Sequence, residues 1–431
     1  MKERKNNILY ELKDYLLLWS TQGISQLGSS ITAFALTLWL YEKTGSSLST
    51  AALTICTYVP YVLVSIFAGA LTDRFDKKKT MLVCDSLAAV STVITLILFK
   101  TGRLMVWHLY ALNILSGLMN TVQQPASEVA MTLIIPKKHY QRTSGLNSLS
   151  RSLVSILHPL LATALYSFVG LTGVIVVDLT TFVIAFTVLL LFIRIPKRIA
   201  ENKEHFIILV KEGLGYLKRT PLVLTLILFL SGINLVASAV DAALPGYVIP
   251  NPKGGSTVLG IVTSCSGIAM IIGSLIVSVL PKPKDRVKVV YLTMLFSMST
   301  ENFVLAFARH PALWCIGQII GWIVVPVMSS NLDVILRSTI PVDLQGRVFA
   351  CRNTLQFFTI PIGLFLGGFM VDNIFEPFMA KHSDSSFLKA LFGSGLGSGA
   401  AVVMFILGVT GSLFCILAGR KLKKYHYSDK T

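Results

Sequence analysis

The chain has 431 residues, of which 53% are hydrophobic and only 14% charged, and its mean hydropathy is +0.70. Soluble domains are about 45–50% apolar and about 25% charged, so these charges are too few to cover a soluble surface. The same values exclude intrinsic disorder, and 31 Gly with 6 Cys exclude a collagen-like or disulfide-framework fold. The composition predicts a multi-pass membrane protein.

Twelve membrane spans follow from the distribution of apolar residues. A bilayer core of about 30 Å requires about 20 apolar residues per helix, and the chain is therefore predicted to be an all-α integral membrane protein. The first span is too long for a signal peptide and lacks a small-residue cleavage site. The predicted spans are 15–41, 47–71, 80–99, 105–125, 145–168, 171–193, 221–246, 257–280, 288–308, 311–336, 348–370 and 398–419.

The basic residues predict the orientation of the chain. An even number of spans puts both termini on one side of the membrane. Of the 38 Lys and Arg, 31 belong to segments on that side and 7 to segments on the other. Because basic loops stay in the cytoplasm, both termini are predicted to be cytoplasmic. The net charge of +17 thus reflects topology, and no nucleic-acid partner is expected.

The longest basic loop, 194–220, separates two halves of six spans, 1–193 and 221–431. It contains an amphipathic stretch, which predicts a helix along the cytoplasmic membrane surface or a simple linker. The halves resemble each other: Pro136 and Pro341 each precede an arginine by six residues, at an offset of 205. Two six-helix bundles related in this way are typical of a transporter with a site between the halves.

The segment GALTDRFDKKK (69–79) follows the second span. Gly69 allows helices to approach closely. Asp73 can accept hydrogen bonds from the free amides of a helix N-terminus. Arg74 and the lysines at 77–79 can anchor the loop in the cytoplasm or form ion pairs.

This segment resembles the loop signature G-x-L-x-D-R-x-G-R-K of the major facilitator superfamily. Asp76 stands in place of the second glycine, a variant associated with the macrolide-efflux and enterobactin-exporter-like branch. Other segments that resemble this branch are SQLGSSITAFALTLWLYEKTGS (25–46), Asp85-Ser86, GLNSLSRS (145–152) and QGRVFACRNTLQFFTIPIGLFLGG (345–368). The resemblance covers essentially the whole chain and implies the superfamily's fold of two pseudo-symmetric six-helix bundles.

The resemblance also implies a cytoplasmic latch between the halves. Asp73 would then cap the start of the eleventh span near Arg347, while Arg74 or Lys77 would meet Glu128 at the end of the fourth. Such a latch holds the outward-open state and breaks as the transporter turns inward.

Two positions depart from exporters of the superfamily. In the fifth span Pro159 is present, but His158 stands where a glycine is usual. In the fourth span Asn113 stands where an arginine associated with proton coupling is usual. Drug export and proton coupling therefore rest on the resemblance to the branch.

Ionisable residues inside the spans are the remaining candidates for substrate binding or coupling, because charge in the membrane is costly. A buried acid can take up a proton on one side and release it on the other. Each of these residues could instead have a structural role: pairing two helices, hydrogen-bonding the free backbone groups of a kinked helix, or forming an ion pair at the membrane surface. The candidates are Asp178, Asp241, Glu301, Arg151, His158 and Arg352, with Asn113 added from the comparison above.

No motif indicates chemistry other than transport. Gly-Lys never occurs, which excludes a P-loop, and H-E-x-x-H, G-x-S-x-G and a Cys/His cluster are absent. No enzyme activity, metal or cofactor is predicted. The six cysteines lie in apolar spans as buried small side chains.

The sequence and the resemblance together predict a monomeric secondary transporter in a bacterial plasma membrane. It would export amphipathic small molecules such as macrolides through a greasy cavity, in exchange for protons and in contact with membrane lipids. The alternatives are a siderophore exporter, a lysophospholipid exporter or flippase, and, more remotely, a membrane-embedded sensor or enzyme.

Overall fold

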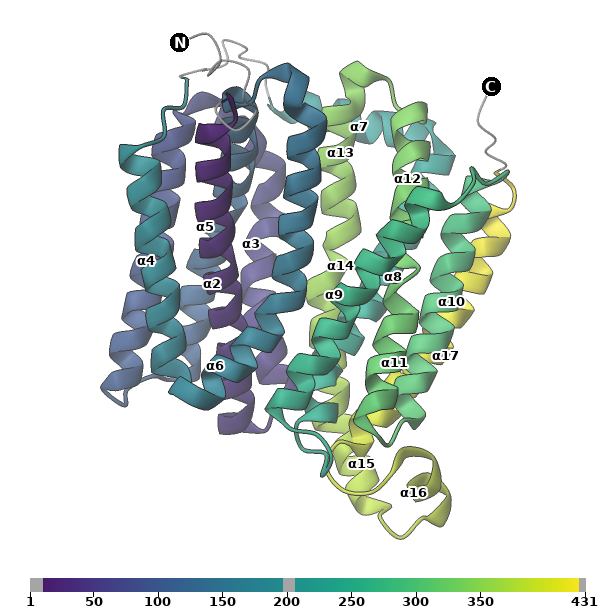
Figure 1. The fold of residues 1–431 in the computed structure, drawn as a ribbon. Coiled ribbons are helices and arrows are strands. Elements are labelled where there is room, and N and C mark those ends of the chain that lie inside the picture. Colours follow the sequence, from purple (N-terminus) through teal and green to yellow (C-terminus); the bar gives the residue numbers. More distant parts are fainter. Residues whose placement is uncertain (1–10, 197–205, 426–431) are drawn as a thin grey trace. The chain divides into compact units, whose positions relative to one another are not determined.

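A computed structural model describes residues 11–196 and 206–425, and all the regular elements in these ranges are helical (Figure 1). Ten helical stretches of the described residues are long and apolar enough to cross a membrane. One of them, Gly145–Leu191, is bent into two limbs, and helix α5 is a further long helix outside the ten. This arrangement is consistent with the twelve predicted spans.

Contacts divide the chain into two compact units. Unit 1 comprises Met1–Trp39 and Cys56–Glu204, and unit 2 comprises Leu40–Ile55 and His205–Thr431. The helices of the first half are α2 (Lys13–Thr44), α3 (Ser47–Arg74), α4 (Lys77–Lys100), α5 (Val106–Ile134), η2 (Lys137–His139) and α6 (Tyr140–Leu191). Those that follow are α7 (Phe206–Arg219), α8 (Pro221–Val248), α9 (Ser256–Val279), α10 (Arg286–Phe307), α11 (Pro311–Trp322), α12 (Val325–Thr339), α13 (Val342–Phe357), α14 (Thr359–Phe369), η3 (Met370–Phe375), α15 (Glu376–Lys381), α16 (Ser386–Phe392) and α17 (Ser398–Leu422).

Helix α6 contains both the fifth and the sixth predicted spans. Gly170 interrupts it with φ +65°, ψ −178°, a conformation that glycine adopts without the steric cost of a Cβ. The limbs on either side match the expected spans 145–168 and 171–193. The two spans are therefore joined by one tight bend at a glycine.

Unit 1 is held together at one end by a small apolar core. Leu18 of α2, Met81 of α4, Ala130 of α5 and Leu189 of α6 are fully buried in it. Beside this core, the hydroxyl of Tyr15 donates to the carbonyl of Thr143 at 3.1 Å. Apolar burial and this hydrogen bond fix α2, α4, α5 and α6 relative to one another.

Unit 2 contains close backbone approaches that depend on glycine. A Cβ on Gly363 or Gly367 of α14 would collide with the carbonyl oxygens of Leu235 and Ala239 on α8. The absence of a side chain lets the two helices pack tightly, as small residues do in membrane helix pairs.

The start of α3 also belongs to unit 2, although it follows the first span in the sequence. Asp372 of η3 accepts hydrogen bonds from the backbone N–H groups of Ser47 at 3.0 Å and Leu48 at 2.9 Å, and from the hydroxyl of Ser46 at 2.6 Å. A carboxylate in this position caps the exposed amides of a helix N-terminus. Asp372 thereby ties α3 to the helices of the second half.

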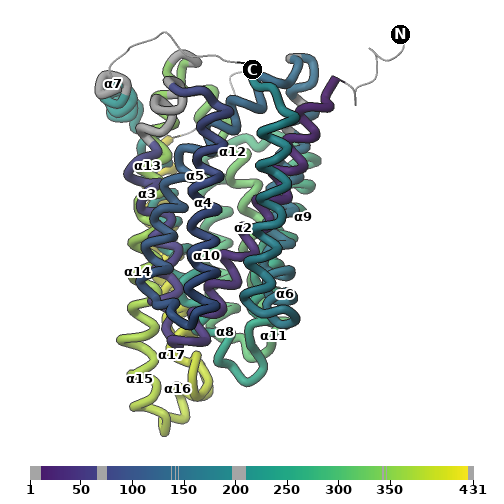
Figure 2. The backbone as a smooth tube through the Cα atoms, turned by 90° about the vertical axis from the view of Figure 1, so that its left-hand side faces the viewer, coloured from purple at the N-terminus to yellow at the C-terminus, as the bar shows by residue number. Residues whose placement is uncertain are grey.

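The helix expected in the linker is present as α7. It runs across the end of α13 (Figures 1 and 2). Glu212 of α7 forms an ion pair with Arg347 of α13, and the hydroxyl of Tyr216 donates to the carbonyl of Thr339 at 2.7 Å. The linker helix is therefore docked on unit 2.

Candidate functional site in unit 1

A cavity of about 560 Å³ lies inside unit 1, between α2, α4, α5 and both limbs of α6. Its volume is within the range of small-molecule sites. The walls carry four charged side chains (Asp85, Glu128, Asp178 and Arg151), six amides (Gln22, Gln26, Asn120, Gln123, Gln124 and Asn147) and six hydroxyls (Ser25, Ser29, Ser30, Thr92, Ser127 and Ser150), with Trp19, Met131, Leu179 and Phe182 as the large apolar side chains. Most of the side chains that line this cavity are thus polar.

Helix periodicity explains why these side chains converge. In α5 the polar residues Asn120, Gln123, Gln124 and Ser127 stand at positions i, i+3, i+4 and i+7, which lie on one helix face. In α2, Gln22 and its neighbours at 26 and 29 follow the same spacing. Two polar stripes on otherwise apolar helices thus bring their amides and hydroxyls to the wall of one cavity.

Asp85 of α4 is half-buried and lines the cavity. The amide of Gln123 on α5 donates a hydrogen bond to its Oδ1, and the side chain of Gln22 also faces its carboxylate. Asp85 belongs to a segment that resembles the family branch, but it is not among the residues predicted for the site.

Asp178, in the second limb of α6, is only 4% exposed. The hydroxyl of Ser29 on α2 donates to its Oδ1 at 2.9 Å. Gly28 allows this approach, because a Cβ there would lie 3.3 Å from the Asp178 carboxylate and closer still to Thr181. The predicted candidate Asp178 therefore lines the cavity and also links α2 to α6.

Glu128 and Arg151 are exposed residues of the cavity wall, on α5 and on the first limb of α6. With Asp85 and Asp178 they give three carboxylates and one guanidinium. When all four are ionised, the walls carry a net negative charge, which favours cationic groups inside the cavity.

Two of the predicted acidic candidates lie in unit 2. Glu301 of α10 is 7% exposed and accepts a hydrogen bond from Nε1 of Trp322 at 3.1 Å. Gly321 leaves room for this carboxylate, with which a Cβ would collide. Asp241 of α8 is exposed. Arg309, the basic residue that follows α10, donates to the backbone carbonyl of Leu391.

Three further candidates lie outside the cavity wall. His158 shares a hydrogen bond of 2.9 Å with the carbonyl of Val154 in its own helix and packs edge-on against Phe34. Asn113 donates to Leu109 at 2.8 Å and accepts from Thr57 at 3.3 Å. The contacts with Phe34 and Thr57 join neighbouring helices, and the other two lie within one helix.

Arg352 is the third of these residues, in α13 of unit 2. Its Nε donates to Gln356 at 3.0 Å, and its Nη1 lies 3.8 Å from Asp333 of α12.

The residues of the predicted latch are only partly described. Gly69, Asp73 and Arg74 lie at the end of α3. Their side chains are outside the part of the chain that the structure describes. Lys77, 4% exposed, donates to the carbonyl of Phe75 at 3.1 Å. Arg347 pairs with Glu212, as described above.

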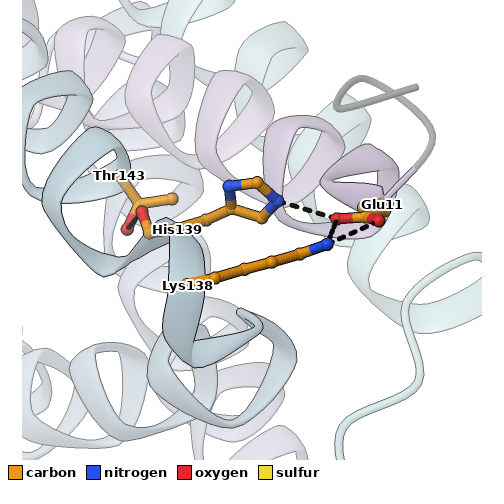
Figure 3. Close-up of polar contacts among 4 residues, drawn as sticks. All are labelled: Glu11, Lys138, His139 and Thr143. Atoms are coloured by element: carbon orange, nitrogen blue, oxygen red, sulfur yellow. Dashed lines mark hydrogen bonds and ion pairs between the residues drawn. The ribbon is translucent and has the colours of Figure 1, made fainter. Parts of the chain in front are cut away.

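Outside the spans, Glu11 lies just before α2 and contacts the segment between α5 and α6 (Figure 3). Its carboxylate is 2.6 Å from Nζ of Lys138 and 2.8 Å from Nε2 of His139. The hydrogen bonds from Lys138 and then from His139 lower the pKa of Glu11 below its usual value of 4.5.

The long apolar helices and the polar cavity buried among them define a multi-pass membrane transporter. The helical arrangement matches solved structures of such proteins, although at low sequence identity. A bacterial homologue of the human lysosomal transporter Spinster, in an inward-facing and occupied conformation, aligns with a TM-score of 0.71 at 13% identity, covering 98% of this chain and 100% of that one. A bacterial homologue of the iron transporter ferroportin, inward-facing, gives 0.69 at 15%, covering 94% and 98%.

The family follows from the sequence comparisons. The family model described as "transmembrane secretion effector" matches residues 11–392, and the chain belongs to this family of the major facilitator superfamily. Macrolide efflux protein A of Streptococcus pyogenes is 25% identical over 378 residues, covering 86% of this chain and 92% of that protein. The multidrug efflux pump Tap of Mycolicibacterium fortuitum is 22% identical over 362 residues, covering 80% and 86%. The predicted superfamily and macrolide-efflux branch are confirmed.

Proposed function

We propose that this transporter exports amphipathic small molecules of the macrolide type across a bacterial plasma membrane, in exchange for protons and by alternating access. The relatives named for macrolide and multidrug efflux support export of such compounds. The observation that carries the proposal is the cavity of unit 1, because three of its wall residues are acids that can bind either a proton or a cation.

The exchange of substrate for protons follows because both would compete for the same carboxylates. An isolated carboxylate inside the membrane is costly, so Asp85 and Asp178 favour a state in which each is hydrogen-bonded, protonated or paired with a cation. Binding of a cationic substrate would displace a proton, and rebinding of a proton would displace the substrate. Such mutual exclusion is what an antiporter needs to couple the two movements.

Asp241 and Glu301 are the proton-carrier candidates of unit 2. Glu301 is buried, with one indole donor to its carboxylate, and an ionised carboxylate in a membrane is costly. We expect Asp241→Asn and Glu301→Gln to uncouple transport from the proton gradient while the protein still inserts. Normal transport in both single variants and in the double variant would remove these residues from the mechanism.

The orientation and the remaining roles are part of the same proposal. With 31 of 38 basic residues on the side of the termini, both termini face the cytoplasm, and the protein acts as a monomer in its lipid bilayer. The segment around Asp73, Arg74 and Lys77 would serve as the cytoplasmic latch. The polar walls of the unit 1 cavity favour a charged or hydroxylated substrate over a lysophospholipid, which needs an apolar path.

The test is macrolide accumulation in bacterial cells that lack other exporters. Cells that produce this protein should accumulate less erythromycin than cells with an empty vector, and a protonophore should abolish the difference. Efflux that is unchanged by the protonophore would exclude proton antiport. Equal accumulation with and without the protein, across a panel of macrolides, would exclude the export function.

A further inference from the structure

We propose that the cavity of unit 1 is a binding site for a protonated amine carried by a hydroxylated ligand, with Asp85 as the counter-ion of the amine. This inference rests on the proposed function, because it names the substrate class at the same cavity. Asp85 has no role in the predictions made from the sequence.

The charge of the walls selects a cation. Asp85, Glu128 and Asp178 face the cavity with Arg151 as the one basic side chain among its lining residues. A carboxylate and an ammonium ion attract each other much more strongly inside a protein than in water, because the surroundings are less polar. An anionic ligand would instead add to the negative charge of the walls.

Asp85 is better placed than Asp178 to receive the amine. Asp178 is almost fully buried and already holds α2 to α6 through Ser29. Asp85 is only half-buried, and Gln123 holds one of its two oxygens. A carboxylate has about four acceptor positions, so a ligand ammonium can still donate to Asp85 while Gln123 fixes its orientation.

Trp19 indicates that the ligand also carries oxygen atoms. Its Nε1 is a buried donor for which the described residues supply no hydrogen-bond acceptor, and the side chain lines the cavity. A buried donor without an acceptor costs free energy, which a hydroxyl, ether or carbonyl oxygen of the ligand would relieve. The indole face can in addition attract the ammonium group.

The other walls suit the same ligand. Six amide and six hydroxyl side chains offer both donors and acceptors to hydroxyl groups. Met131, Leu179 and Phe182 provide apolar contacts for the carbon skeleton. The volume of about 560 Å³ accommodates an amino-sugar with part of a larger molecule. The site thus recognises the polar, cationic end of an amphipathic substrate.

The experiment measures equilibrium binding to the purified full-length protein in detergent, at pH 7. The probes are erythromycin, whose amino-sugar carries a tertiary amine, and the same macrolide without its dimethylamino group. The wild-type protein should bind the cationic probe at least about tenfold more tightly than the neutral one. Equal affinities would overturn the proposal without any use of variants.

The variant Asp85→Asn identifies the counter-ion. It should weaken binding of erythromycin about tenfold or more and change the affinity for the neutral probe less than about twofold. The matched control Asp14→Asn removes an exposed carboxylate at the start of α2, outside the cavity, and should change neither affinity. An Asp85→Asn protein that loses both probes equally, or keeps both, would contradict the role of Asp85.

The outcomes separate this inference from the proposed function. Preference for the cationic probe in detergent, without efflux from cells, would leave the site standing and remove the export function. Efflux from cells, with equal binding of both probes, would leave export standing and remove the ammonium site.

Discussion

The carboxylate of Asp372 accepts a hydrogen bond from the backbone N–H of Leu48 at 2.9 Å. Together with the bond from Ser47, it caps the first turn of α3. The contact joins a residue after the eleventh predicted span to the start of the second. On the proposed topology this contact lies on the outer side of the membrane.

We predict that Asp372→Ala loosens the start of α3. Loss of a helix cap costs about 1 kcal/mol, which corresponds to a change of about fivefold in the population of the state with an open first turn. A cysteine placed at Ser49 in a cysteine-free protein should react correspondingly faster with a membrane-impermeant maleimide. Asp384→Asn, an exposed acid in the loop before α16, is the matched control. Equal labelling rates in the Asp372→Ala and control proteins would show that this contact does not hold the start of α3 in place.

The docking of α7 on α13 predicts a contrast between two glycines of α7. A Cβ on Gly213 would lie 2.8 Å from the carbonyl oxygen of Arg347 and 2.8 Å from Sγ of Cys351, whereas a Cβ on Gly215 meets nothing within 4 Å. Gly215→Ala should raise the melting temperature slightly, because alanine favours a helix by about 1 kcal/mol over glycine. Gly213→Ala should lower it, since overpacking costs about 1–3 kcal/mol. Thermal unfolding in detergent measures both, and equal melting temperatures would mean that α7 is not packed on α13 in solution.

The pair of α8 and α14 gives a similar prediction. Gly367→Ala would place a Cβ against the carbonyl of Ala239, which is backbone and cannot move aside, whereas Gly145 of α6 has open space around it. We expect Gly367→Ala to lower the melting temperature by several degrees and Gly145→Ala to leave it unchanged or raised. A Gly367→Ala protein as stable as the Gly145→Ala protein would contradict this packing.

Glu11 predicts a pH-dependent contribution to stability. Its folded-state pKa is lowered from 4.5 by hydrogen bonds from Lys138 and His139 (Figure 3). A lowered carboxyl pKa stabilises the folded protein above the unfolded-state value, and the contribution disappears as the pH falls through the folded-state pKa. Glu11→Gln should therefore lower the melting temperature at pH 7, with a difference that shrinks below about pH 4.5. Asp14→Asn serves as the control, and a difference that is independent of pH would exclude the ion pair as its cause.

The sequence predicts the helices well because each span is a long apolar run. The bend between the fifth and sixth spans is also predictable, since the apolar run is interrupted near Gly170. The convergence of Asp178, Arg151 and Glu128 on one cavity is not, because it depends on which face of α2, α5 and α6 turns inward. No count of apolar residues contains that information.

Asp85 was missed for a related reason. It lies only five residues inside the predicted span 80–99 and could be attributed to the membrane surface. The signal that would have found it is the polar stripe of α5, in which Asn120, Gln123 and Ser127 recur at helical spacing. Amides on a membrane helix need polar partners, and Asp85 on the neighbouring helix supplies one to Gln123. His158, by contrast, was a predicted candidate that does not line the cavity. The carbonyl of Val154 in its own helix already satisfies one of its ring nitrogens.

The most direct test of the central claim is proton movement driven by substrate. The purified protein is reconstituted into liposomes that contain a pH-sensitive dye and have the same pH inside and outside. An outward gradient of erythromycin is then established. The account predicts that protons enter as the macrolide leaves, that Asp85→Asn and Asp178→Asn reduce this influx, and that Asp14→Asn does not. Macrolide efflux without any proton influx in the wild-type protein would contradict the account.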